Sequence, residues 1–110
     1  MGTQTIRAAV SGCDREAVSD IVALLELNGR HVESQALRDA GDRLDGIRYA
    51  LNVLADERLL DAAVVEEWRE ALRVLRLTEQ TAGYALSRGF ATGVHMVRDK
   101  VARLVESASS

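Results

Sequence analysis

The chain has 110 residues, of which 47% are hydrophobic but only 4% aromatic, and it contains no proline. This length supports one hydrophobic core, and a proline-free composition rich in Ala and Leu is typical of long, uninterrupted helices. The formal net charge of −3 argues against a general polyanion-binding protein, and the single cysteine, Cys13, excludes an intramolecular disulfide and a cysteine-based zinc site.

Residues 1–12 contain two glycines and no clear periodicity, so we predict a flexible N-terminal arm ahead of one helical domain over residues 13–107. The arm lacks the apolar run of about 7–15 residues that a signal peptide needs, and no stretch reaches the roughly 20 apolar residues of a membrane span. A single cysteine also suits a reducing compartment. We therefore expect a cytoplasmic protein without a membrane partner.

The first predicted helix covers residues 14–28. Its apolar side chains recur at the spacing i, i+3, i+4, i+7 that makes one face of an amphipathic helix, and they are Val18, Ile21, Val22 and Leu25. Ser11 or Asp14 can cap the N-terminus of this helix, and Asn28-Gly29 supplies the left-handed residue that commonly ends one.

Two longer predicted helices follow, over residues 31–56 and 62–87. The apolar stripe of the first keeps a 3-4 spacing over more than two heptads and comprises Leu37, Ala40, Leu44, Ile47, Leu51 and Leu54. The stripe of the second comprises Val65, Trp68, Leu72, Leu75, Ala82 and Leu86. Trp68 is the only tryptophan, and its place on this stripe predicts that it belongs to the core.

A last apolar stripe predicts a helix over residues 90–107, followed by a short tail over residues 108–110. The stripe comprises Phe90, Val94, Val97, Val101 and Leu104. Its phase continues from Leu86. The sequence therefore leaves open whether residues 62–107 form two helices or one long helix that tolerates Gly89.

Short connections favour antiparallel neighbours, which sets the expected arrangement of these helices. Residues 31–56 and 62–87 should form a long hairpin, with the other two helices packed against it. The predicted fold class is therefore all-α, a small antiparallel bundle of about four helices. The long heptad stripes leave a homodimer open as well, in which two hairpins complete a four-helix core.

Several glycines fall within or between the periodic stretches, namely Gly41, Gly46, Gly83, Gly89 and Gly93. Each glycine in a helix interior costs about 1 kcal/mol relative to alanine. Their presence indicates close backbone approach between helices or a bend, and the alternative is simple tolerance in a stable bundle. Gly89 is the best candidate for a break in the helical pattern.

The sequence shows no complete catalytic or metal-binding constellation. Cys13 precedes a helix whose dipole can lower a thiol pKa, but a nucleophilic cysteine needs a base, and neither His31 nor His95 stands at a known Cys-His spacing. His95 and Asp99 lie four residues apart, yet the paired Glu-x-x-His motifs of a dimetal bundle are missing. We expect no enzyme activity, no metal and no cofactor.

The predicted helix over residues 62–87 has a second, narrower apolar stripe opposite its main one. This candidate binding surface comprises Leu77 and Tyr84, edged by Arg69, Arg73 and Arg76. Tyr, Leu and Arg together are the composition of interface hot spots. We therefore predict that the surface binds another protein, which makes the chain a regulatory module such as an adaptor or inhibitor. The alternative is that another helix of the same chain covers the stripe.

A DNA-binding regulator is the alternative function. Ala85, Gly89 and Phe90 could stand as the small residue, the turn glycine and the following apolar residue of a helix-turn-helix. That alignment expects apolar residues where His95 and Arg98 stand, and the chain is acidic, so nucleic acid is the less favoured partner. If DNA binds, we expect the contacts to come from Arg88, Arg98, Lys100 and Arg103.

Overall fold

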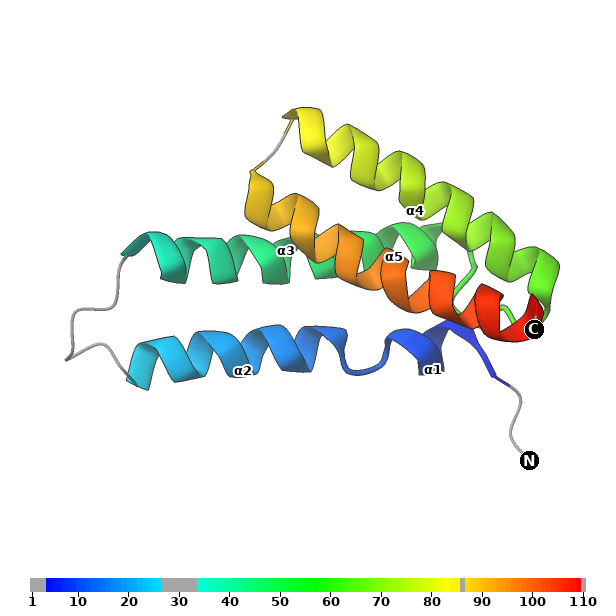
Figure 1. Cartoon of the computed structure of the whole chain (residues 1–110), viewed down its shortest axis with the longest axis horizontal. Coiled ribbons are helices and arrows are strands. Elements are labelled where there is room, and N and C mark those ends of the chain that lie inside the picture. The colour runs from blue at the N-terminus through cyan, green and yellow to red at the C-terminus, as the bar shows by residue number, and fades with distance from the viewer. Residues whose placement is uncertain (1–3, 27–33, 86, 110) are drawn as a thin grey trace.

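The computed structural model describes residues 4–26, 34–85 and 87–109, and of residues 34, 83–85 and 109 the backbone alone. Within these ranges it has no strand, and its helices are α1 (Ile6–Val10), α2 (Cys13–Glu26), α3 (Ser34–Asp56), α4 (Val65–Ala85) and α5 (Arg88–Ser109) (Figure 1). Each of the four long helices overlaps one predicted from apolar periodicity. The predicted all-α bundle is therefore confirmed.

The flexible arm predicted at the N-terminus is wrong for residues 6–10, which form α1. Thr5 caps this helix, because its hydroxyl accepts a hydrogen bond at 3.2 Å from a backbone N–H in the first turn. Ile6 and Val10 are buried, and the backbone N–H of Ile6 donates to the carbonyl of Ala62 at 3.2 Å. A five-residue helix is too short to show periodicity, so tertiary contacts rather than pattern hold it in place.

The long helices follow one another in space in the order α2, α3, α5, α4 (Figure 1). Because α5 packs against both α3 and α4, those two helices touch only slightly. The predicted long hairpin of residues 31–56 with residues 62–87 is therefore wrong. The physical reason is that α5 is apolar enough to be the central element, since Val94, Val97 and Val101 are fully buried.

Gly46 of α3 and Gly93 of α5 bring the backbones of these two helices into contact. A Cβ atom on Gly93 would overlap the carbonyl oxygen of Arg43, and a Cβ atom on Gly46 would overlap the carbonyl oxygen of Phe90. Backbone atoms cannot move aside as a flexible side chain can. Close helix approach is therefore the correct explanation for both glycines.

The chain reverses direction between α4, which ends at Ala85, and α5, which begins at Arg88, so the single long helix is excluded. Ser87 caps α5 by accepting a hydrogen bond from a backbone N–H of its first turn at 3.2 Å, and it donates to the Asp42 carboxylate at 2.9 Å. Gly89 is not at the break but inside α5, where a Cβ atom would lie 2.8 Å from a backbone oxygen of α3.

Two other glycines have different outcomes. Gly41 faces open space, with no atom within 4 Å of a Cβ built there, so this position shows the tolerance that the sequence offered as the alternative. Gly83 lies among the residues of which only the backbone is described. Among the glycines whose surroundings are described, Gly46, Gly89 and Gly93 therefore allow the close α3–α5 contact, whereas Gly41 takes no part in it.

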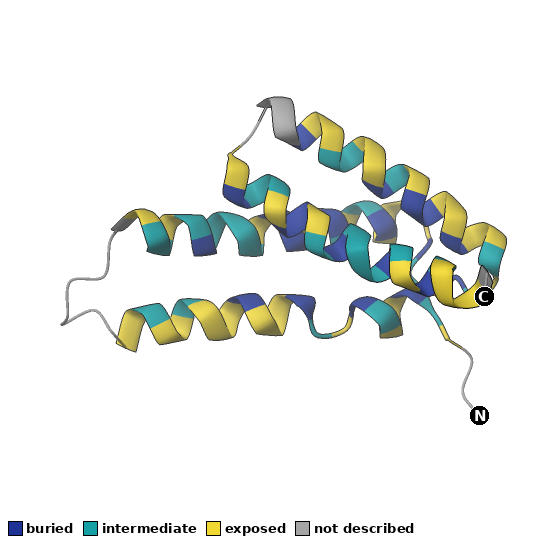
Figure 2. Ribbon diagram, viewed as in Figure 1, coloured by how far each residue is buried: buried dark blue, intermediate teal, exposed yellow. Residues whose placement is uncertain are grey.

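The core lies where α1, α3, α4 and α5 meet (Figure 2). Its largest fully buried aliphatic side chains are Ile6, Ile47, Leu54, Leu75, Val94, Val97 and Val101. Trp68 belongs to this core, as predicted, and its indole N–H donates to the carbonyl of Ala62 at 2.9 Å. The fully buried residues of α2 are only Cys13 and Ala17, so most of this helix lies outside the core.

Candidate functional site

The surface predicted on α4 is partly assembled in the structure. Leu77 is 52% exposed, so within the described part of the chain no other helix buries it. Arg69, Arg73 and Arg76 are exposed on the same helix. The side chain of Tyr84 lies outside the described residues. Among the side chains that the structure describes, the α4 surface therefore consists of Leu77 and three arginines.

One of these arginines already has a partner on its own helix. The Nε of Arg73 donates to Glu70 Oε2 at 3.0 Å, and its Nη2 also binds the other carboxylate oxygen. This hydrogen bond to Arg73 holds the pKa of the exposed Glu70 carboxyl below its ordinary value. A negatively charged partner would therefore meet Arg69 and Arg76 more readily than Arg73.

A second exposed apolar surface lies on α2, and we call Val18, Val22 and Leu25 the α2 stripe. Their side chains are 40%, 46% and 51% exposed, respectively. At 3.6 residues per turn they fall within an arc of roughly 60°, about 130° around the helix from the side that packs on α3. Figure 2 shows that the buried residues of α2 lie near its start, with exposed and half-buried residues beyond them.

The spacing of the α2 stripe predicts a buried face, but its side chains are exposed in the structure. Its i, i+3, i+4, i+7 pattern is that of a face packed on a core. In the structure the buried contact is made instead by the small side chains of Cys13 and Ala17, with Ile21 and Leu24 half-buried. Helix α2 is therefore apolar on two sides, and α3 covers only one of them.

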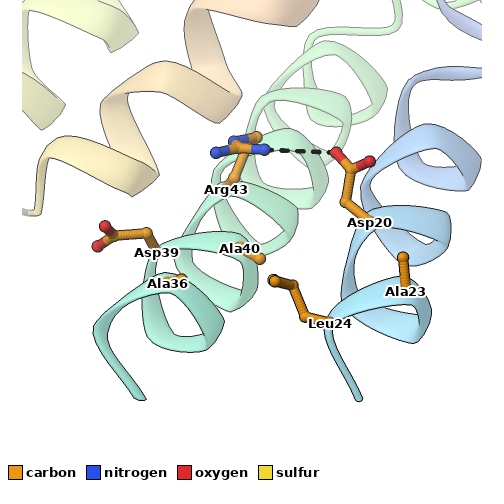
Figure 3. Close-up of a pocket in the computed structure, with 7 residues that line it drawn as sticks. All are labelled: Asp20, Ala23, Leu24, Ala36, Asp39, Ala40 and Arg43. Atoms are coloured by element: carbon orange, nitrogen blue, oxygen red, sulfur yellow. Dashed lines mark hydrogen bonds and ion pairs between the residues drawn. The ribbon is translucent and has the colours of Figure 1, made fainter. Parts of the chain in front are cut away.

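A groove of about 460 Å³ lies between α2 and α3, near the end of the hairpin that they form (Figure 3). Its lining residues are Asp20, Ala23, Leu24, Ala36, Asp39, Ala40 and Arg43. The alanines leave the groove open, because their side chains are too short to bridge the two helices. A volume of this size is within the range of small-ligand pockets, but the walls offer only one arginine and two carboxylates for recognition.

Arg43 closes one end of this groove. Its Nη1 donates to Asp20 Oδ2 at 3.4 Å, which joins α3 to α2, and its buried Nε has no hydrogen-bond partner among the described residues. On its other side a smaller hollow of about 120 Å³ is lined by Arg88 and Thr92 of α5. Asp39, on the rim of both hollows, already accepts a hydrogen bond from Gln35 at 2.8 Å.

Two of the four basic residues assigned to DNA in the alternative hypothesis pair with carboxylates of the same chain, whereas Arg88 is exposed. Arg98 pairs with Glu79 at 2.5 Å, and Arg103 pairs with Asp99 at 3.0 Å. His95 is exposed and also contacts Glu79, at 2.7 Å from Nδ1 to Oε1. Helices α4 and α5 lie antiparallel along their length rather than crossing as a helix-turn-helix pair does (Figure 1). These ion pairs reduce the positive charge that Arg98 and Arg103 could offer to a phosphate backbone.

Cys13 is buried and is the first residue of α2. Burial raises the pKa of its thiol above the ordinary value of 9.0, although the nearby charge of Lys100 acts in the opposite direction. The helix dipole therefore does not make it a reactive thiolate. Within the described residues, no group of three His, Cys, Asp or Glu side chains could hold a metal ion, and His31 lies outside those residues.

The groove between α2 and α3 was not predicted from the sequence. The signal was present as Ala23, Ala36 and Ala40, small residues on helices that were predicted to pack together. It could not be used, because which side of α2 faces α3 depends on the path of the chain and not on local periodicity. The exposure of the α2 stripe was missed for the same reason.

Comparison with known proteins gives no assignment, since no protein-family model, curated protein or solved structure matches the chain. None of the helices in the described ranges is long and apolar enough to span a membrane. The exposed helix surfaces are therefore the features from which a function can be inferred.

Proposed function

We propose that this chain is a small helical protein-interaction module, acting in the cytoplasm as a regulator, and that the α2 stripe is its principal binding surface. One observation carries the proposal: three large apolar side chains, aligned on one side of α2, are between 40% and 51% exposed. Single exposed apolar residues are common on monomers, but an aligned group of this kind marks an interaction site.

The charge and shape of the surface support a protein rather than a small ligand. The α2 stripe is convex and spans two helical turns, which suits contact with another helix and offers no enclosed site. The groove on the other side of α2 is open along the hairpin, and its Arg43 is already engaged with Asp20. A convex apolar helix face of this kind gains its binding energy from burying apolar area.

The α4 surface is proposed as a secondary contact of the same module. It offers Leu77, with Arg69 and Arg76 free of ion pairs within the described residues. Arginines beside an exposed leucine suit the rim of an interface, where they tune association rate more than affinity. The Arg76→Glu substitution combined with Leu77→Ala should therefore weaken partner binding without lowering the melting temperature, because both side chains are exposed.

The test is site-specific photocrosslinking in cells of the source organism. A photoreactive amino acid replaces Val22 in the α2 stripe, and as a matched control it replaces Glu16, which is exposed on the opposite side of the same helix. We expect discrete protein adducts from position 22, lost when Leu25→Asp is added, and none from position 16. Equal labelling at both positions, or none at position 22, would refute the proposal.

A further inference from the structure

We infer that a second copy of this chain covers the α2 stripe, through an antiparallel α2–α2 contact around a two-fold axis. The inference rests on the proposed function and names the occupant of that surface. Helix α2 lies at the edge of the molecule and packs mainly against α3, so its other side can approach an identical helix (Figure 1). A two-fold contact of this kind uses the same surface on both chains.

The spacing of the stripe fixes the register. Val18, Val22 and Leu25 are separated by four and then three residues, the repeat of the seam between two packed helices. With the axis at the level of Asp20, Val18 of one chain lies opposite Val22 of the other, and the two valine pairs form the centre. Asp20 does not interfere, because its side chain is directed away from the seam toward Arg43.

The same register gives complementary charges at both ends of the contact. One heptad step before Val22 on the seam is Arg15, which then lies opposite Leu25 of the second chain, with Glu26 beside it. The aliphatic stem of Arg15 can cover Leu25 while its guanidinium reaches Glu26. Both residues are exposed, and neither has an ion-pair partner within the described part of the chain.

The other charges of α2 favour the antiparallel direction. The helix has four carboxylates and one arginine, so a parallel pair would set Glu26 at the level of Glu26 of the other chain. Asp14 and Glu26 lie on opposite flanks of the stripe, so the antiparallel pair does not bring them together. Ile21, half-buried in the single chain, extends the apolar seam on the flank of Asp14.

A contact of two helical turns is smaller than a standard protein interface, so we expect a weak dimer with a dissociation constant on the order of 100 µM. Sedimentation of the full-length chain from about 10 µM to about 1 mM measures it directly. Val22→Asp should weaken the dimer by at least about 30-fold, because it places a charge at the centre of the seam. Ala23→Asp adds the same charge outside the stripe and serves as the matched control, with less than about a 3-fold effect.

Charge exchange tests the register. Arg15→Glu and Glu26→Arg should each weaken the dimer by roughly 5-fold to 10-fold, since the two-fold axis repeats every pair, and the double variant should restore it to within about 2-fold. A monomer at about 1 mM, a dimer insensitive to Val22→Asp, or no restoration in the double variant would overturn the inference. A monomer whose residue 22 still crosslinks to a foreign protein would overturn it too, while the proposed interaction function would stand.

Discussion

Helices α5 and α2 make the two largest contacts with α3, and these contacts differ sharply. On one side α5 approaches so closely that neither Gly46 nor Gly93 could accommodate a Cβ atom. On the other side α2 leaves a groove of about 460 Å³ and keeps Val22 and Leu25 46% and 51% exposed. The first contact is built from backbone against backbone, whereas the second relies on a few small side chains and one ion pair.

The difference shows where stability and binding reside in this chain. Dense packing between α3 and α5 gains dispersion energy from many atom contacts and allows one geometry. The loose contact of α2 buries little apolar area, so this helix can exchange solvent for a partner at low cost. We expect the molecule to unfold through α2 before α3 and α5 separate.

The largest expected effect comes from adding one methyl group at the tight contact. Gly93→Ala should destabilise the fold by about 4 kcal/mol, because the helices must separate to admit the new atom. Gly41→Ala is the same substitution on the open side of α3, and it should stabilise the protein by up to about 1 kcal/mol through helix propensity. Urea unfolding measures both changes in the free energy of unfolding. Equal changes for the two variants would show that the α3–α5 contact is no tighter than the open side of α3.

A smaller effect is expected from truncating one apolar side chain at the α3–α5 contact and one on the α2 stripe. Ile47 is fully buried at the α3–α5 contact, so Ile47→Ala should cost about 3 kcal/mol. Leu25→Ala should cost less than about 0.5 kcal/mol, since Leu25 is half-exposed in the single chain. Thermal unfolding of dilute samples, below the concentration at which chains associate, separates the two. A large loss from Leu25→Ala would show that α2 is covered within the monomer.

The smallest effect concerns Cys13, the buried first residue of α2, and appears only at high pH. Burial raises the pKa of the Cys13 thiol above its ordinary value of 9.0. Below that pH both states hold the proton, whereas above it the unfolded chain loses the proton first, so the contribution of the thiol to stability falls as pH rises. Unfolding free energy from about pH 8 to about pH 10 should decrease more for the wild type than for Cys13→Ala. Parallel curves would show that Cys13 is solvated in the folded state.

Much of the fold was predictable, because helices with strong apolar periodicity are specified locally. The stripes that contain Ile47, Leu75 and Val97 are buried as their spacing indicates, and Trp68 is in the core. The pairing of helices was not predictable in the same way. An apolar stripe predicts that a helix has a buried face, but it does not identify the helix that covers this face. The central position of α5 could therefore not be predicted from the periodicity.

The candidate site was predicted only in part. Leu77 is exposed beside Arg69, Arg73 and Arg76, as expected for a second apolar stripe opposite the buried one on α4. The side chain of Tyr84 lies outside the described residues. The α2 stripe was interpreted as an ordinary amphipathic face, because Val18, Val22 and Leu25 have the spacing of one. Its exposure depends on α2 having two apolar faces and one neighbour.

The sequence by itself determined the helical class, the approximate helix ends and most core positions, since these follow from propensity and periodicity within a few turns of chain. The tertiary structure alone decided that α5 lies between α3 and α4, that Gly46 and Gly93 meet, and that the α2 stripe faces water. Those outcomes depend on which residues far apart in the chain come together. The pairing that is adopted is the one in which the helix surfaces fit together most closely, and local sequence patterns do not specify this fit.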